Sequence, residues 1–379
     1  MGRSKRRHGS RPPGVREIAG TLGVSIGTVD RALHNRQGIN PGTRARVLDA
    51  AKRLGYRPNL AARFLSSEKR LRIAVNFPKE LASFWDLVRD GLLDAAHAFE
   101  ANGLEVVSHW YPGRGEGERE ALAQALDDDV RGVILVPGFP ERLGDLICLA
   151  AKRNIPILYV NTDAPGTERL TVIWADPLTN GAMVGELMGH FLRGQGRVMP
   201  VTGHLQTVEH ASKLEGFRNA LAALWPGIEV AAVVEGHEDE REAYEKCRER
   251  LASDRRIAGV YVSTANSPPV VRAIQDEGLA GSVTVITTDL YPALARFIES
   301  GVVAATIDQR PWVQGQMAIQ TMYRYLVYDV VPPAAIGLSP HVVMRSNLRL
   351  LMERLRTTAE SGPVVAGEAG KAAPAARAR

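Results

Sequence analysis

The hydrophobic pattern divides the chain into a short helical N-terminal part and a long part in which strands and helices alternate. In the N-terminal part, apolar residues recur at helical spacing on either side of Gly23. They are Ile18, Leu22, Val24, Val29 and Leu33. This spacing predicts two short helices joined by a tight turn at the glycine, with the apolar side chains directed inward.

A third short helix is predicted to begin at Asn40 and Pro41, because proline fits the first helical position, where its missing N–H group is not needed. Its expected buried residues are Val47, Ala51 and Leu54. The third helix should stop at Gly55. The Ser25 hydroxyl is placed to cap the start of the second helix. Three short helices with one tight turn predict a helix-turn-helix DNA-binding domain.

From Leu71 onward, short apolar runs alternate with amphipathic segments. The runs predict strands at residues 72–76, 104–108, 132–137, 155–161, 171–174, 197–202, 230–235, 259–263, 283–287 and 303–307. Helical segments between them include residues 87–100, 143–152, 183–192, 212–224 and 269–277. Fully apolar strands that alternate with helices indicate parallel sheets covered on both faces. So many units predict two doubly wound lobes, with a cleft at the carboxyl ends of the strands.

Charge separates the same two parts. Residues 1–70 hold 16 Lys and Arg against 4 Asp and Glu, a net charge of +12; the chain totals of 47 and 42 leave 31 and 38 for the rest, a net charge of −7. A basic head on an acidic body suits binding to the phosphate backbone of nucleic acid. For residues 1–13 alone, a solvated basic tail is the simpler interpretation.

Length and composition bound the class of protein. A chain of 379 residues is too long for one small domain, and its 45% of apolar residues suffice for a large core. No apolar run approaches membrane-spanning length, and no apolar signal segment follows the basic N-terminus, so a cytoplasmic protein is expected. Cys148 and Cys247 lack the spacing of a metal or redox site and are expected to be buried or inert thiols.

Several short motifs keep a fixed order and spacing through residues 24–65. They are Val24-Ser25, Thr28-Val29, Arg31, Asn40-Pro41-Gly42-Thr43-Arg44, Gly55-Tyr56, Pro58-Asn59 and Leu65. Together they resemble the head of the lactose/galactose repressor (LacI/GalR) family. The resemblance implies a homodimer whose recognition helices, here residues 25–33, enter successive major grooves of a near-palindromic operator.

The resemblance also implies which residues contact DNA. They are Ser25, Ile26, Gly27, Thr28, Arg31, His34, Asn59, Ala62 and Leu65. Bases would be read at Ile26, Gly27 and Arg31, but Gly27 offers no side chain and Ile26 can only touch a thymine methyl group. Asp30 replaces a usual serine and either accepts from a cytosine amino group or pairs with a neighbouring arginine.

Residues 58–70 should join head and body as a hinge. Asn59 can cap a helix at residues 60–65, which is too short to form alone and is expected to fold only when two copies meet over DNA. The resemblance implies that Leu65 wedges between base pairs in the minor groove and kinks the duplex. The alternative is a flexible linker whose Leu65 packs on the body.

Residues 71–348 resemble the type I periplasmic sugar-binding proteins, especially the ribose-binding ones, which form the effector domain of this family. The resemblance implies ligand-binding residues at the strand ends and nearby, namely Phe84, Trp85, Asn161, Asp163, His210, Asn266, Asp289 and Gln309. Asp289 and Gln309 coincide with sugar-binding positions, whereas Asn161 stands where relatives have a carboxylate. Asp163 either substitutes for that carboxylate or shapes the turn, and Phe84 and Trp85 either stack on the ligand or belong to the core.

The expected fold class is therefore an all-α helix-turn-helix head plus an α/β, two-lobed, doubly wound body of the type I periplasmic-binding-protein kind. The expected domains are a basic disordered N-terminus (1–13), the helix-turn-helix domain (14–57), the hinge and linker (58–70), the ligand-binding and dimerisation domain (71–349) and a disordered tail (361–379).

The expected function is a DNA-binding transcriptional regulator, a repressor of carbohydrate genes that is switched by a sugar; a non-sugar metabolite as effector is the alternative. An enzyme is not expected, because no Walker, nucleophile-elbow, HExxH or CxxC motif is present, and for the same reason no cofactor or metal is expected. A transporter's binding component would need export, and a purely architectural DNA-binding protein would not need the two-lobed body.

Overall fold

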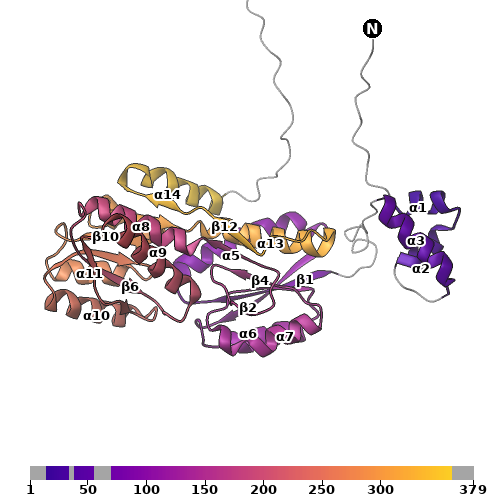
Figure 1. The fold of residues 1–379 in the computed structure, drawn as a ribbon, viewed down its shortest axis with the longest axis horizontal. Coiled ribbons are helices and arrows are strands. Elements are labelled where there is room, and N and C mark those ends of the chain that lie inside the picture. Colours follow the sequence, from indigo (N-terminus) through magenta and orange to yellow (C-terminus); the bar gives the residue numbers. More distant parts are fainter. Residues whose placement is uncertain (1–13, 34–37, 55–69, 361–379) are drawn as a thin grey trace, which may run out of the picture. The chain divides into compact units, whose positions relative to one another are not determined.

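The computed structural model describes residues 14–33, 38–54 and 70–360 (Figure 1). The chain divides into two compact units, one with every described residue before residue 70 and one with almost every residue after it. We call them the head (14–54) and the body (70–360). The predicted hinge and disordered ends, with the DNA-contact residues His34, Asn59, Ala62 and Leu65, lie outside the described residues.

The head consists of α1 (Val15–Leu22), α2 (Ile26–Leu33) and α3 (Pro41–Leu54) around one small core. The predicted turn is confirmed, because Gly23 takes a left-handed φ of 65°. The predicted cap is also confirmed, since the Thr28 N–H donates to Ser25 Oγ at 3.1 Å. Leu54 was expected to be buried but is 37% exposed, because it is the last residue of α3, and Ala50 fills the core instead.

The body has two lobes, each a sheet with helices on both faces (Figure 1). Lobe 1 has the strand order β12-β5-β4-β3-β1-β2, all parallel. Its strands are β1 (Leu71–Pro78), β2 (Leu104–Tyr111), β3 (Gly132–Leu135), β4 (Ile157–Val160), β5 (Thr171–Ala175) and β12 (Ala335–Leu338). Its helices are α5 (Ala82–Glu100), α6 (Glu118–Asp127), η1 (Pro140–Arg142), α7 (Gly144–Lys152) and α13 (Pro311–Tyr328).

Lobe 2 has the order β13-β11-β10-β9-β6-β7, with β8 also paired to β6. Its strands are β6 (Gly196–Thr202), β7 (Ile228–Val230), β8 (Val234–Glu235), β9 (Ile257–Val262), β10 (Thr284–Thr288), β11 (Ala305–Asp308) and β13 (His341–Val343). Its helices are α8 (Pro177–Phe191), α9 (Val208–Leu224), α10 (Glu240–Ser253), α11 (Pro268–Asp276), α12 (Pro292–Glu299) and α14 (Arg345–Glu360).

The predicted strands are present, with one correction and two additions. The apolar stretch 230–235 is not one strand, because the chain leaves the sheet between β7 and β8 and both short strands pair with β6. The pattern did not predict β12 and β13, which are short and partly exposed. β12 returns to the sheet of lobe 1 and β13 runs antiparallel beside β11, so the chain crosses between the lobes more than once.

Glycines allow one close helix crossing in each lobe. A Cβ atom built on Gly91 of α5 would lie 1.9 Å from the Trp312 carbonyl oxygen of α13. One built on Gly181 of α8 would lie 1.8 Å from the Lys213 carbonyl oxygen of α9. A side chain at either position would force the helices apart, so the glycines set how closely α5 approaches α13 and α8 approaches α9.

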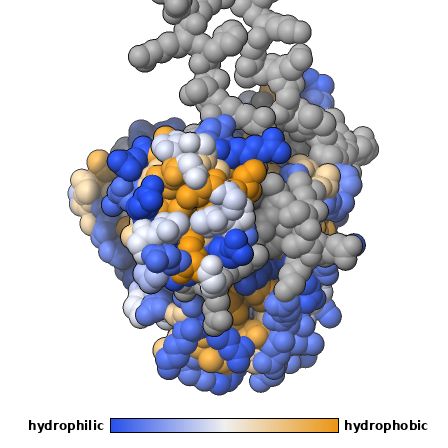
Figure 2. Space-filling view, turned by 90° about the vertical axis from the view of Figure 1, so that its right-hand side faces the viewer, coloured by the Kyte–Doolittle hydropathy of each residue, from blue (hydrophilic) through white to orange (hydrophobic). Residues whose placement is uncertain are grey.

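On the face of the molecule in Figure 2, hydrophobic residues form small groups among hydrophilic ones. Within the described ranges, no helix is long and apolar enough to cross a membrane. Cys247 is buried as expected, and burial raises the pKa of its thiol to about 12. Cys148 is not buried but lies exposed on α7.

Candidate functional sites

The exposed side of α2 is the first candidate site. Val29 and Ala32 are buried in the head core and fix the helix by its inner face. On the outer face, Ile26 is 51% exposed and Arg31 is also exposed. Gly27 and Ser25 are exposed and Thr28 is half-buried, so the described DNA-contact candidates share a side of the head that is open to a partner.

The second candidate site is a small cavity in the cleft between the lobes, with a volume of about 20 Å³. Lobe 1 contributes Leu81, Phe84, Trp85, Arg114 and Asn161. Lobe 2 contributes Glu209, His210, Lys213, Thr264, Ala265, Asp289 and Gln309. These residues come from strand ends and helix starts, which is where doubly wound sheets bring together side chains that are distant in sequence.

Six of the eight residues predicted for the ligand line this cavity. They are Phe84, Trp85, Asn161, His210, Asp289 and Gln309. Asp163 does not line it, because both carboxylate oxygens are taken up by Arg169, at 2.5 Å from Nε and 2.7 Å from Nη2. Asn266 does not line it either, although its side chain is buried and Nδ2 has no hydrogen-bond partner among the described residues.

The aromatic pair forms the lobe 1 wall. Phe84 and Trp85 begin α5 and pack edge to face, with ring centroids 4.8 Å apart. Trp85 also stacks on Phe77 of β1 at 5.9 Å, which ties the pair to the core. Each ring therefore belongs to the core and also faces the cavity, so the two predicted roles are compatible.

Asp289 and Gln309 form one unit at the ends of adjacent strands. Gln309 Nε2 donates to Asp289 Oδ1 at 2.9 Å, and both side chains are buried. Asp289 takes a left-handed φ of 71°, held by its N–H bond to the Ile307 carbonyl at 2.8 Å. Burial raises the pKa of the Asp289 carboxyl to about 7, against the lowering effect of Lys213 and Gln309.

The first two turns of α9 place charged groups on the opposite wall. Lys213 is fully buried; it pairs with Glu209 one turn earlier and donates to the Ser263 carbonyl at 3.1 Å. Burial lowers the pKa of His210 to about 3, so the imidazole is neutral at physiological pH. Its Nδ1 accepts from the His204 N–H at 3.0 Å, which leaves the proton on Nε2, 3.2 Å from Glu209 Oε2.

Arg114 connects the lobes. It follows β2 in lobe 1, where its Nε donates to Glu80 at 2.7 Å, and its Nη2 donates to Glu238 of lobe 2 at 2.8 Å. Burial opposes the charge of the guanidinium, but the two carboxylates outweigh it and raise its pKa. The Glu209 N–H adds a second bridge to Thr162 Oγ1 at 3.3 Å. The described state of the body is therefore a closed one.

Sequence reasoning missed Arg114, Glu209 and Lys213. Glu209 and Lys213 are four residues apart in a helix whose inward face should be apolar, so the interruption was a detectable signal. Arg114 lies between Gly113 and Gly115 directly after a strand, where a loop offers its side chain to a cleft. Among the residues that the structure describes, no group of His, Cys, Asp and Glu is arranged to hold a metal ion.

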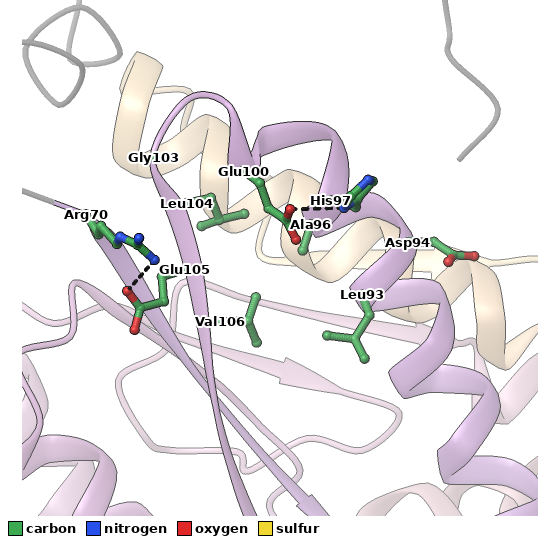
Figure 3. Close-up of a pocket in the computed structure, with 10 residues that line it drawn as sticks. All are labelled: Arg70, Leu93, Asp94, Ala96, His97, Glu100, Gly103, Leu104, Glu105 and Val106. Atoms are coloured by element: carbon green, nitrogen blue, oxygen red, sulfur yellow. Dashed lines mark ion pairs between the residues drawn. The ribbon is translucent and has the colours of Figure 1, made fainter. Parts of the chain in front are cut away.

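The third candidate site is a hollow outside the cleft, on lobe 1, with a volume of about 740 Å³ (Figure 3). The apolar side chains of Leu93, Leu104 and Val106 lie between α5 and β2. Charged groups surround them, with Arg70 paired to Glu105 at 3.5 Å and the imidazole of His97 3.0 Å from the carboxylate of Glu100. β2 is the edge strand of its sheet, and edge strands present backbone groups to a partner.

Comparison with known families gives the two parts separate matches. Residues 15–59 match the bacterial regulatory proteins of the lacI family. Residues 73–328, more than half of the chain, match the periplasmic binding protein domain. The chain belongs to the lacI family of regulatory proteins. It is a DNA-binding transcriptional regulator whose body has a periplasmic-binding-protein fold.

Similar proteins carry the same two parts or the body alone. Catabolite control protein A of Priestia megaterium is 25% identical over 88% of this lacI-family chain and 99% of its own. The HTH-type transcriptional regulator GntR of Pseudomonas aeruginosa is 31% identical over 58% of this chain and 62% of its own. The structure of GanP, a glucose-galactose binding protein from Geobacillus stearothermophilus, has a TM-score of 0.68 with 23% identity over 74% of this chain and 99% of its own.

Proposed function

We propose that this regulator is a repressor switched by a sugar or a related polyhydroxy compound that binds between the lobes of the body. The observation that carries the proposal is the cavity wall itself. It combines an aromatic pair, two carboxamides and a carboxylate, namely Phe84, Trp85, Asn161, Gln309 and Asp289. Apolar faces with a few fixed polar groups suit the two-sided chemistry of a sugar ring. GanP, which shares the fold, binds glucose and galactose.

The proposed switch is a change in lobe closure. A cavity of about 20 Å³ has room for about one water molecule. A sugar must therefore enter while the lobes are apart, which requires that Arg114 release Glu238. A ligand that contacts both walls stabilises the closed state and shifts the equilibrium toward it. Movement of lobe 1 then shifts Arg70, where the segment that leads to the head joins the body.

We propose that the regulator binds a near-palindromic operator as a homodimer, with the hollow at Leu93 and Val106 in contact with a second copy. The hollow includes Arg70, the first described residue after the segment that leads to the head. Two heads on adjacent half-sites limit how far apart residue 70 of the two copies can lie. A dimer surface beside Arg70 meets that requirement. Because chromosomal DNA is the partner, the proposed location is the cytoplasm.

The proposal is tested with the full chain in two steps. Thermal-shift screening against sugars, polyols and other metabolites should find a compound that raises the melting temperature, because a ligand of the folded state stabilises it by mass action. That compound should change the affinity for operator DNA in fluorescence anisotropy. Asp289→Asn should weaken its binding by about 3- to 30-fold, as a charged hydrogen bond becomes a neutral one.

The matched control is Asp308→Asn, because Asp308 ends the neighbouring strand and does not line the cavity. This variant should keep both ligand and DNA affinity, and Asp289→Asn should keep DNA affinity. Equal losses in the two variants would contradict the assignment of the cavity. Binding only by a non-sugar metabolite would support the alternative effector.

A further inference from the structure

The charges around the cavity are unbalanced. The buried ionisable groups comprise two cations, Arg114 and Lys213, and three carboxyl groups, Glu209, Glu238 and Asp289, of which Asp289 is partly protonated near neutral pH because its pKa is about 7. A fourth carboxylate, Glu80, is 19% exposed and contacts Arg114. His210 adds no charge, because burial holds its pKa far below neutral. Carboxyl groups therefore outnumber cations in a region from which water is largely excluded.

Both cations are already engaged within the protein. Arg114 donates to Glu80 at 2.7 Å and to Glu238 at 2.8 Å, and Thr264 Oγ1 holds Glu238 in place from the other side at 2.6 Å. Lys213 pairs with Glu209 and donates to a backbone carbonyl. An anionic ligand would have to take a cation from one of these pairs, which would leave a buried carboxylate without its partner.

The unpaired polar atoms of the wall point to the same conclusion. Among the described residues, two acceptor atoms on side chains that line the cavity lack a hydrogen-bond partner, Asn161 Oδ1 and Gln309 Oε1. One donor, Trp85 Nε1, is in the same state. A hydroxyl group can serve either kind of atom, whereas an ionised carboxylate or phosphate can only accept. The wall therefore needs a ligand that mainly donates.

We infer that the effector is a polyhydroxy compound that donates hydrogen bonds and carries no carboxylate or phosphate group. This inference rests on the proposed function and narrows it. Neutral sugars and cyclic polyols fit, and a protonated amino group in place of a hydroxyl also fits. Sugar acids and sugar phosphates are excluded by the paired cations and the surplus of carboxylates.

The test uses the full chain and matched ligand frames. Glucose, glucosamine, glucuronate and glucose 6-phosphate form one set, galactose and its corresponding forms a second, and ribose with ribose 5-phosphate a third. Thermal shift selects the frames that bind, and isothermal titration calorimetry gives the Kd of each form. Within a binding frame, the acid and phosphate forms should bind at least about tenfold more weakly than the neutral form.

An acid or phosphate form that binds more tightly than its neutral counterpart overturns the inference and leaves the polyhydroxy effector standing. A complete absence of binding in every frame instead counts against the proposed function, and the inference falls with it. The two failures are therefore distinguishable.

A variant tests the electrostatic cause. Glu238→Gln removes one carboxylate that does not line the cavity and can keep the bond from Thr264. The gap in Kd between anionic and neutral forms should narrow by about three- to tenfold. Glu242→Gln is the control: Glu242 is a half-buried carboxylate of the same lobe that pairs with Lys246 and does not line the cavity, so its loss should leave the gap unchanged. If Glu238→Gln does not fold, Glu80→Gln replaces it; an unchanged gap in the folded variant overturns the inference.

Discussion

At the scale of single residues, several non-glycine residues around the cleft hold left-handed backbone. Asn161 has a φ of 68°, Glu238 of 59° and Asp289 of 71°. Such conformations cost roughly 1–3 kcal/mol each and persist where neighbouring contacts fix them. Here the N–H groups of Asn161 and Asp289 each donate to the adjacent strand at 2.8 Å. The same contacts that impose the unusual backbone direct both side chains into the cavity.

The raised pKa of Asp289 predicts a pH dependence of stability. Its folded-state pKa of about 7 lies above the ordinary 3.8, so its contribution is fully present below about pH 4 and is lost as the pH rises to about 7. Asp289→Asn has no such loss and keeps a residue that tolerates left-handed backbone. Its melting temperature should therefore rise relative to the unaltered protein between pH 5 and pH 8, in ligand-free differential scanning fluorimetry. A difference that stays constant with pH would contradict the burial of an ionisable Asp289.

At the scale of elements, α2 and the first two turns of α9 each combine a packed face with a polar one. Val29 and Ala32 are buried in the core of the head, so the other face of α2 is exposed in a fixed orientation. On α9, Gly181 brings α8 against the Lys213 backbone, and this crossing fixes the charged turn at the cavity. Rigid support of this kind lets an element present side chains without rearrangement on binding.

Arg31 is the exposed cation of the recognition helix, and it predicts a specific loss on substitution. Arg31→Ala should weaken operator binding by about 1–3 kcal/mol and relax the base preference at one position of each half-site. Competition anisotropy with single-base operator variants measures both effects. Arg53→Ala is the control, because Arg53 is engaged with Asp49 at 3.1 Å on α3. Equal losses at Arg31 and Arg53, with no change in base preference, would contradict direct base reading by α2.

At the scale of the whole molecule, the chain consists of a basic head, which suits DNA, and an acidic body, which holds the cavity. The net charges of +12 for residues 1–70 and −7 for the rest favour contact of DNA with the head and disfavour contact with the body. In the proposed switch, lobe movement couples the buried cavity to the segment before residue 70. Binding of DNA and binding of effector are then linked by one equilibrium between body conformations.

The charge division predicts a steep salt dependence of DNA binding. If about 6–10 phosphates are neutralised, the affinity should fall by roughly 10³- to 10⁵-fold between 50 and 200 mM salt. Titration of a labelled operator at several salt concentrations gives the slope, and sedimentation of the complex gives two chains per operator. Effector binding should show almost no salt dependence, because its polar contacts are buried. A flat slope for DNA, or one chain per operator, would contradict the proposed mode of binding.

The sequence by itself determined the head, the order of most strands and helices, and half of the residues of the cavity wall. The head followed from local signals, since the turn at Gly23, the cap at Ser25 and the Pro41 start act within a few residues. Asp289 and Gln309 were found because the ends of buried strands are visible in the pattern and the resemblance assigned them a role.

Only the tertiary structure decided which charges meet in the cleft. Arg114 and Glu238 are 124 residues apart, and nothing local pairs them, because their contact depends on how the two sheets face each other. The burial of Lys213 depends on α8 crossing α9, and the entry of β12 into lobe 1 depends on a chain path that leaves and re-enters the lobe. Asp163 was a candidate ligand-binding residue because of its position after a strand, but the folded turn brings Arg169 against its carboxylate. Local patterns fix backbone elements, whereas partners across a cleft are chosen by packing between lobes.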